Sequence, residues 1–180
     1  MKRQKLARLV LFLTPLVLFL GTAPAWGHDF SLSTSFDCVG PGACEQTSDH
    51  EEADPFKGWA NITVTNTGTE AWGDFHFELY QVTAPIDNVF FDVSSPNEPT
   101  SSQSGLSWSV SGGGHVLDLF FYGDALLPTE TATFSVYTDN TTDQVDFFGT
   151  SFYPTPIPEP GTLGLLAAGL IGLAAFRKRS

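Results

Sequence analysis

The chain has 180 residues and a formal net charge of −12, with twenty acidic residues against eight Lys and Arg. Seven of the eight basic residues lie in the first ten or the last five positions, and only Lys57 lies between them. Nineteen acidic residues lie within residues 28–157, so this segment carries a formal charge near −18. Such a surface repels nucleic acid and anionic membranes, which argues against both as partners. Divalent cations and neutral or basic sugar polymers remain possible partners.

The first 27 residues have the pattern of a secretory signal peptide. Four basic residues precede a 12-residue apolar stretch at 9–20, which is short for a membrane span, and small residues follow. Cleavage could follow Ala25 or Gly27, and we favour Gly27 because Pro24 lies inside the first site. The sequence therefore predicts export, with residues 28–155 forming the exported domain.

Residues 28–155 alternate apolar and polar side chains in one short segment after another. Gly, Pro and Asn separate these segments, and the length suffices for one domain with its own core. The pattern predicts an all-β fold, a single antiparallel β-sandwich of immunoglobulin-like or jelly-roll-like type. The expected strands lie within 30–36, 59–66, 75–79, 89–93, 106–110, 117–121, 132–136 and 145–152.

Two polar segments, 45–55 and 94–104, are predicted to be loops. Sixteen Phe and four Trp residues are expected mainly in the core. Trp72 and Trp108 could instead form a platform on which sugars stack.

Two cysteines, Cys38 and Cys44, lie close together in the exported segment. Outside the cytoplasm such a pair is expected to form a disulfide, worth about 2 kcal/mol for so small a loop. Free thiols or a metal site are the alternatives, and His50 is the only histidine close by in sequence.

Several side chains could bind a metal, although no cofactor is required by the pattern. Asp139, Asp143 and Asp146 could bind Ca²⁺, or they could lie in a solvated loop, because the glycine and closing glutamate of an EF-hand are missing. If cleavage follows Gly27, His28 would offer its amine and imidazole to copper, provided that a second histidine lies nearby.

A second acidic cluster precedes the expected strand at 59–66, and it could likewise either bind Ca²⁺ or lie in a solvated loop. Its members are Asp49, His50, Glu51, Glu52 and Asp54. Motifs of serine hydrolases and zinc proteases are absent from the sequence, so we expect no catalytic residues and no enzyme activity.

The last 25 residues form a tail of three parts. Pro158, Glu159 and Pro160 come first, an apolar run follows at 161–176, and Arg177-Lys178-Arg179 follows that run. Sixteen helical residues would span roughly 24 Å at ~1.5 Å each, and the basic residues could extend to the membrane interface. The sequence therefore predicts a transmembrane helix whose basic end stays in the cytoplasm. An anchor that is never cleaved is the alternative.

This tail resembles the PEP-CTERM sorting signal of exported bacterial proteins, through Pro158-Glu159-Pro160, the apolar helix and the basic cluster. The resemblance implies recognition by an exosortase, an integral-membrane cysteine protease or transpeptidase of exopolysaccharide-producing Gram-negative bacteria. The segments 61–68, 72–77 and 138–143 are similar to exported domains of other PEP-CTERM proteins, for which no activity is implied.

Together these features favour a non-enzymatic surface or extracellular-matrix protein, associated with exopolysaccharide and passing through an inner-membrane intermediate. A secreted carbohydrate-binding module, or a metal-dependent enzyme acting on polysaccharide, is the alternative. The alternative would use calcium at the acidic loops or copper at His28.

Overall fold

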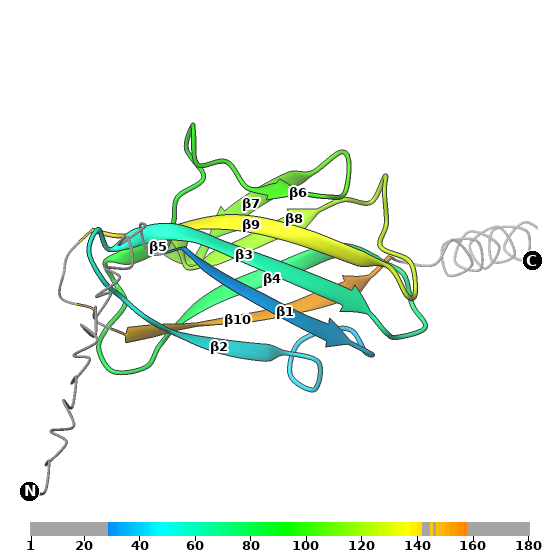
Figure 1. Cartoon of the computed structure of the whole chain (residues 1–180), viewed down its shortest axis with the longest axis horizontal. Coiled ribbons are helices and arrows are strands. Elements are labelled where there is room, and N and C mark those ends of the chain that lie inside the picture. Colours follow the sequence, from blue (N-terminus) through cyan, green and yellow to red (C-terminus); the bar gives the residue numbers. More distant parts are fainter. Residues whose placement is uncertain (1–28, 142–144, 146, 158–180) are drawn as a thin grey trace, which may run out of the picture.

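The computed structural model describes residues 29–141, 145 and 147–157. These residues form two five-stranded sheets stacked face to face (Figure 1), so the predicted all-β sandwich is confirmed. The first sheet contains β1 (Phe30–Phe36), β3 (Lys57–Asn66), β9 (Thr131–Asn140), β5 (Val89–Phe91) and β6 (Thr100–Ser101). The second contains β2 (Gln46–Glu51), β10 (Phe147–Pro156), β4 (Trp72–Gln81), β8 (Val116–Phe120) and β7 (Ser107–Ser111). A 3₁₀ turn, η1 (Gly112–Gly114), joins β7 to β8.

Aromatic rings fill the space between the two sheets. Phe75 of β4 is completely buried and contacts five other aromatic rings, with centroid distances of 5.0 to 6.3 Å. The nearest, at 5.0 Å, belongs to Phe134 of β9 in the opposite sheet. Offset and edge-to-face ring pairs of this kind stabilise beyond their buried area. The five rings around Phe75 are those of Phe36, Trp72, Phe77, Phe134 and Phe152.

One strand pair departs from the antiparallel pattern. β1 runs parallel to β3, with Phe30 opposite Ala60 and Phe36 opposite Asn66. Between these strands the chain crosses to the second sheet, forms β2 and crosses back, so it enters β3 in the direction of β1. Parallel neighbours require such a crossover, and apolar alternation alone does not reveal it.

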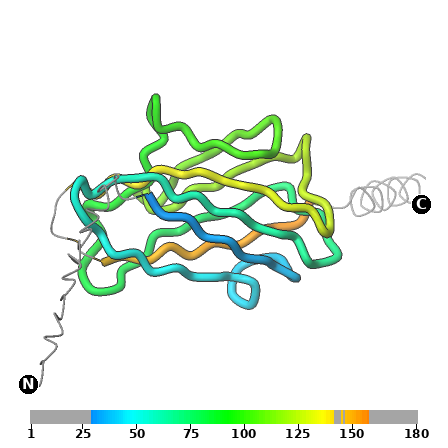
Figure 2. Tube along the Cα trace, viewed as in Figure 1, coloured from blue at the N-terminus to red at the C-terminus, as the bar shows by residue number. Residues whose placement is uncertain are grey.

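The predicted loop at 45–55 is wrong, because Gln46–Glu51 forms edge strand β2, paired with β10. Its residues are polar, so the alternation of apolar side chains that identifies a half-buried strand is missing. Inward-facing His50 nevertheless packs on the rings of Phe30 and Phe148, at 4.8 and 5.4 Å. The other predicted loop, 94–104, is irregular except for β6, and Figure 2 shows the green segment between β5 and β7 standing out from the sandwich.

The turn between β3 and β4 is fixed by one buried amide. Asn66 donates from Nδ2 to the carbonyl oxygens of Glu70 at 2.8 Å and Leu126 at 3.1 Å, and its Oδ1 accepts from the Gly68 amide at 3.0 Å. A β-carbon at Gly68 would lie 2.8 Å from the Asp37 carbonyl oxygen, so the close approach of these backbones requires glycine. The β3–β4 turn therefore packs closely against the residue that follows β1.

Replacing Phe75 by alanine should test the role of the ring cluster. We expect a loss of about 3–5 kcal/mol in unfolding free energy, because the change leaves a cavity between the sheets. Val110→Ala, at a side chain that is 37% exposed, is the control and should cost less than about 1 kcal/mol. Guanidinium denaturation of the purified protein measures both, and equal losses would contradict the assignment of the core.

Candidate functional site

The strand that leads into the C-terminal tail lies inside the second sheet. β10 pairs with β2 on one side and β4 on the other, and it ends at Pro156. The next amide, that of Ile157, donates to the Ala71 carbonyl at 3.1 Å. The chain is thus hydrogen-bonded up to the residue before Pro158, which gives the tail a fixed starting point on the domain.

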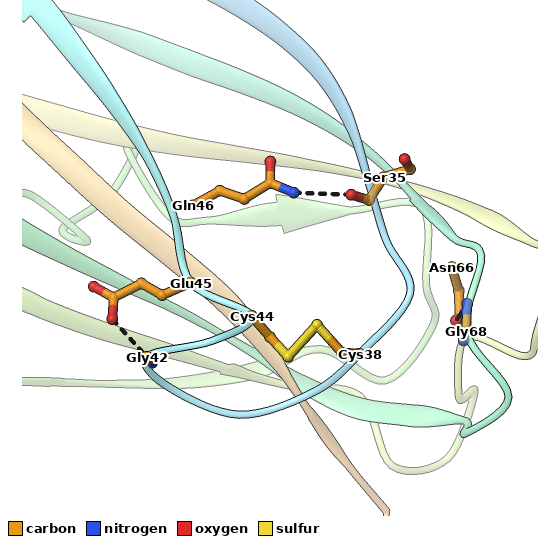
Figure 3. The surroundings of a disulfide bond; sticks show 8 residues. All are labelled: Ser35, Cys38, Gly42, Cys44, Glu45, Gln46, Asn66 and Gly68. Atoms are coloured by element: carbon orange, nitrogen blue, oxygen red, sulfur yellow. Dashed lines mark hydrogen bonds between the residues drawn. A yellow bond between two sulfur atoms is a disulfide. The ribbon is translucent and has the colours of Figure 1, made fainter.

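A disulfide loop contacts the same strand. Cys38 and Cys44 are bonded, with their Cα atoms 5.6 Å apart, so the predicted disulfide is present (Figure 3). Within the loop, the Gly40 amide donates to the Pro154 carbonyl of β10 at 2.7 Å, and the Gly42 amide donates to Glu45 Oε2 at 3.2 Å. The disulfide therefore fixes the β1–β2 connection against the end of β10.

The tail itself lies outside the described residues. This includes the predicted sorting residues Pro158, Glu159 and Pro160, the apolar run at 161–176 and the basic residues Arg177, Lys178 and Arg179. The signal peptide also lies outside them. No helix within the described part of the chain is long and apolar enough to cross a membrane.

On the outer face of the second sheet, a histidine lies between two carboxylates. His76 of β4 is opposite Asp118 of β8 and Tyr153 of β10. Its Nδ1 lies 2.6 Å from Asp118 Oδ1, and its Nε2 lies 3.5 Å from Asp74 Oδ1. The imidazole also stacks on the Tyr153 ring at 4.9 Å.

The carboxylates of this cluster have further hydrogen-bond donors. Tyr122 Oη donates to Asp74 Oδ2 at 2.8 Å, the Thr155 hydroxyl donates to Asp74 Oδ1, and Ser109 Oγ donates to Asp118 Oδ2 at 3.2 Å. Four strands and the segment after β8 therefore meet in one network, which we call the His76 cluster: Asp74, His76, Ser109, Asp118, Tyr122 and Thr155.

The electrostatics of the His76 cluster favour a protonated imidazole. Burial opposes the charged form most strongly, but hydrogen bonds and charges from Asp74 and Asp118 outweigh it and raise the pKa of His76 above 6.5. Burial also opposes the charged form of Asp74, yet hydrogen bonds from His76, Thr155 and Tyr122 hold its pKa below 3.8. Burial, the Asp74 hydrogen bond and nearby negative charge raise the pKa of Tyr122 to about 12.

This arrangement is suited to holding strands together. The His76 Nε2 atom also lies 3.3 Å from the Thr155 hydroxyl oxygen, so the imidazole connects β4 to both β8 and β10. Since Thr155 lies one residue before the end of β10, the His76 cluster also fixes the strand that precedes the tail.

The two tryptophans considered as sugar platforms differ in exposure. Trp72 is completely buried and belongs to the ring cluster, so the expectation that it lies in the core is confirmed and the alternative of a surface platform is excluded for it. Trp108 is 38% exposed on β7, the outermost strand of its sheet.

Of the predicted metal ligands, Asp139 lies on β9, opposite Lys57 of β3, whereas Asp143, Asp146 and His28 lie outside the described residues. The second acidic cluster is divided by strand alternation, because neighbouring side chains of β2 point to opposite faces. Within the described ranges, no three His, Cys, Asp or Glu side chains are grouped so that they could hold a metal.

Glu52 is a buried acid whose burial was not predicted from the sequence. Its side chain is 2% exposed, and its Oε1 lies 3.4 Å from His50 Nε2. Among the described residues its buried Oε2 has no hydrogen-bond partner. Burial, partly opposed by a hydrogen bond with Asn140 and reinforced by Asp139, raises the pKa of Glu52 from 4.5 to about 7. Nothing in the sequence distinguishes Glu52 from the exposed acid Glu51 beside it.

Comparison with protein families identifies the tail. Residues 156–179 match the model of the PEP-CTERM protein-sorting motif, which confirms the resemblance of the sequence. The chain is therefore an exosortase substrate, exported and sorted to the cell surface or extracellular space. Comparison with curated proteins and with solved structures finds no match for the chain.

His76→Gln should lower stability in a pH-dependent way. Because the folded-state pKa of His76 is raised, its contribution is complete below about pH 6.5 and is lost as pH rises through the folded-state pKa. We expect the variant to lose about 1–2 kcal/mol at pH 6 and less at pH 9, measured by denaturant unfolding. His115→Gln removes a histidine outside the cluster and should change stability by less than about 0.5 kcal/mol. A loss that is the same at both pH values would contradict the charge assignment.

Glu52→Gln should stabilise the domain in alkali. Folding raises the pKa of Glu52 from 4.5 to about 7. The wild type therefore loses stability as pH rises through this range, and the loss persists above pH 7. The glutamine variant lacks this penalty and should gain about 1–3 kcal/mol at pH 8, with little change at pH 4. Glu78→Gln, at an exposed glutamate on β4, is the control and should have little effect at either pH. A gain that persists undiminished at pH 4 would indicate a different cause.

Proposed function

We propose that this PEP-CTERM protein is a non-enzymatic component of the bacterial surface or extracellular matrix, associated with exopolysaccharide. One observation carries the proposal: β10, hydrogen-bonded on both sides, leads directly into the sorting motif at 156–179. A stiff domain with a sorting tail is suited to remaining outside the cell. The producing organism is then a Gram-negative bacterium, and the protein passes through an inner-membrane intermediate.

The disulfide and the charge support a life outside the cytoplasm. Disulfides form and persist in oxidising compartments such as the periplasm and the cell exterior. The charge near −18 of residues 28–157 keeps the domain soluble and away from anionic lipid after release. The basic residues at the C-terminus would stay in the cytoplasm until the tail is processed.

The polar network on the sheet surface supports a structural rather than a catalytic role. Asp74 and Asp118 accept hydrogen bonds from Tyr122, Thr155 and Ser109, and both carboxylates flank the His76 imidazole. These bonds connect strands β4, β7, β8 and β10. Their arrangement contributes to the rigidity of the domain.

The alternative is a secreted module that binds polysaccharide or an enzyme that cuts it. A groove beside Trp59 on the outer face of the first sheet favours binding of polysaccharide over its cleavage. A polymer incubated with the protein should keep its chain length if the domain only binds or assembles, and should shorten if the domain is an enzyme.

Glu159→Ala in the producing bacterium tests the sorting role. Because the motif glutamate would be lost, we expect a larger form retained in the membrane fraction, detected by immunoblotting and by mass spectrometry of the C-terminus. Glu78→Ala, an exposed glutamate on β4, is the matched control and should be processed normally. Unchanged size and location of the Glu159 variant would overturn the proposal that processing uses this motif.

A further inference from the structure

The outer face of the first sheet contains a groove of about 350 Å³ that is open to solvent. This volume lies at the lower end of the ~300–1,000 Å³ typical of small-molecule sites. Strands β3, β9 and β6 supply the floor, and the segment before β6 supplies one wall. Its lining residues are Trp59, Asn61, Pro96, Glu98, Thr100 and Ser135.

The floor of the groove is a row of small polar side chains in register. Asn61 of β3 is opposite Ser135 of β9, and Ser135 is opposite Thr100 of β6. Ser135 Oγ donates to Asn61 Oδ1 at 2.7 Å, so two of the three groups are already oriented by each other. Amide and hydroxyl groups in such a row can both donate and accept hydrogen bonds.

An indole forms the aromatic wall. Trp59 lies two residues before Asn61 on the same face of β3, and its ring meets Tyr137 of β9 edge to face at 5.2 Å. Its backbone amide donates to Asp29 Oδ1 at 2.8 Å. The Tyr137 contact orients the indole and the amide bond fixes the backbone that carries it, which lowers the cost of ordering the ring on binding.

The opposite wall is held by one carboxylate. Asp92 Oδ1 accepts from the Ser94 amide at 2.9 Å and from Ser94 Oγ at 2.6 Å, and Oδ2 accepts from Asn97 Nδ2 at 2.6 Å. The Asp92 amide donates to the Tyr137 carbonyl at 3.0 Å, which ties this segment to β9. Pro96 and Glu98 therefore lie on a segment that the hydrogen bonds of Asp92 hold against β9.

The chemistry of the lining points to one class of ligand. Among the residues that the structure describes, no Lys or Arg lines the groove, and the segment 28–157 carries a charge near −18, so phosphate, sulfate and acidic sugar polymers would be repelled. An uncharged sugar ring offers an apolar face for the indole and hydroxyls for the amide, hydroxyl and carboxylate groups opposite. Since the groove is open, a ring within a longer polymer can occupy it.

We propose that this groove is a binding subsite for neutral sugar rings of an extracellular polysaccharide, with Trp59 as the stacking surface and Asn61, Ser135 and Thr100 as hydrogen-bonding groups. This inference rests on the proposed function as a matrix protein, and it specifies the polymer as uncharged. The subsite lies on the first sheet, whereas the His76 cluster and the strand that leads into the tail lie on the second.

Titration of the full chain with neutral oligosaccharides tests the subsite. The probes are hexasaccharides of glucose, mannose and galactose. The full chain is kept in a detergent without a sugar headgroup, so that the detergent does not compete with the probes for the groove. At least one probe should bind to the wild type in calorimetry, and Trp59→Ala should weaken its binding by about tenfold or more, as expected when a stacking surface is removed. Trp108→Ala removes an exposed tryptophan elsewhere and should leave the affinity within about twofold, which makes it the matched control.

Asn61→Ala provides a second variant in case Trp59→Ala unfolds, and it should weaken the same binding about fivefold through loss of a hydrogen bond. Absence of binding by every probe, or binding unchanged in both groove variants, would overturn the inference. Binding only to a cationic amino-sugar polymer, lost in high salt, would also overturn it, because that would be ion exchange with the acidic surface.

The same variants separate this inference from the proposed function. Trp59→Ala should still be processed and reach the cell surface, but less of it should stay with the matrix after washing. If the wild type is sorted normally yet binds no neutral sugar, only the subsite fails. If Glu159→Ala is sorted normally while the purified protein binds sugar, the role of the tail fails and the subsite stands.

Discussion

Burial of aromatic rings between two sheets is the constraint on which the rest of the structure depends. Phe75 and its neighbours fill the interior, and this packing sets the direction of the side chains from Asp74 to Leu79 of β4, beyond the irregularity near Gly73. Because successive residues point to opposite faces, His76 must lie on the outer surface. There it meets Asp118 and Tyr153, which the pairing of β4 with β8 and β10 places beside it. The surface cluster is thus a consequence of the core.

A domain with a single lysine must satisfy most of its carboxylates through hydrogen bonds. Asp92 accepts from Ser94 and Asn97, which hold its pKa below 3.8, with a further contribution from Lys57. Asp74 uses Tyr122, Thr155 and His76. Hydrogen bonds from neutral side chains therefore supplement the few positive charges, and they connect neighbouring strands at the same time.

The exception is Glu52, which is buried with one oxygen lacking a partner among the described residues. Its raised pKa and that of His76 act in the same direction, since both groups bind protons more tightly in the folded state. These two groups consequently contribute more to stability in mild acid than at higher pH. The ring cluster, the disulfide and the pairing of β10 on both sides do not depend on the protonation of these groups. These are the features that matter for a domain whose last strand leads into a sorting tail.

The sequence by itself determined the destination of the protein and the class of its fold. The sorting motif is a contiguous segment, so it is recognised without the fold. The alternation of apolar and polar side chains along Ala60, Ile62 and Val64 is also local, because it depends only on neighbours in the chain. The disulfide was likewise predictable, because Cys38 and Cys44 are separated by only six positions in the chain. Only the tertiary structure decided that polar Gln46–Glu51 forms a strand and that β1 runs parallel to β3. It also decided that Trp59, Ser135 and Thr100 line one groove, because these depend on contacts between residues far apart in the chain.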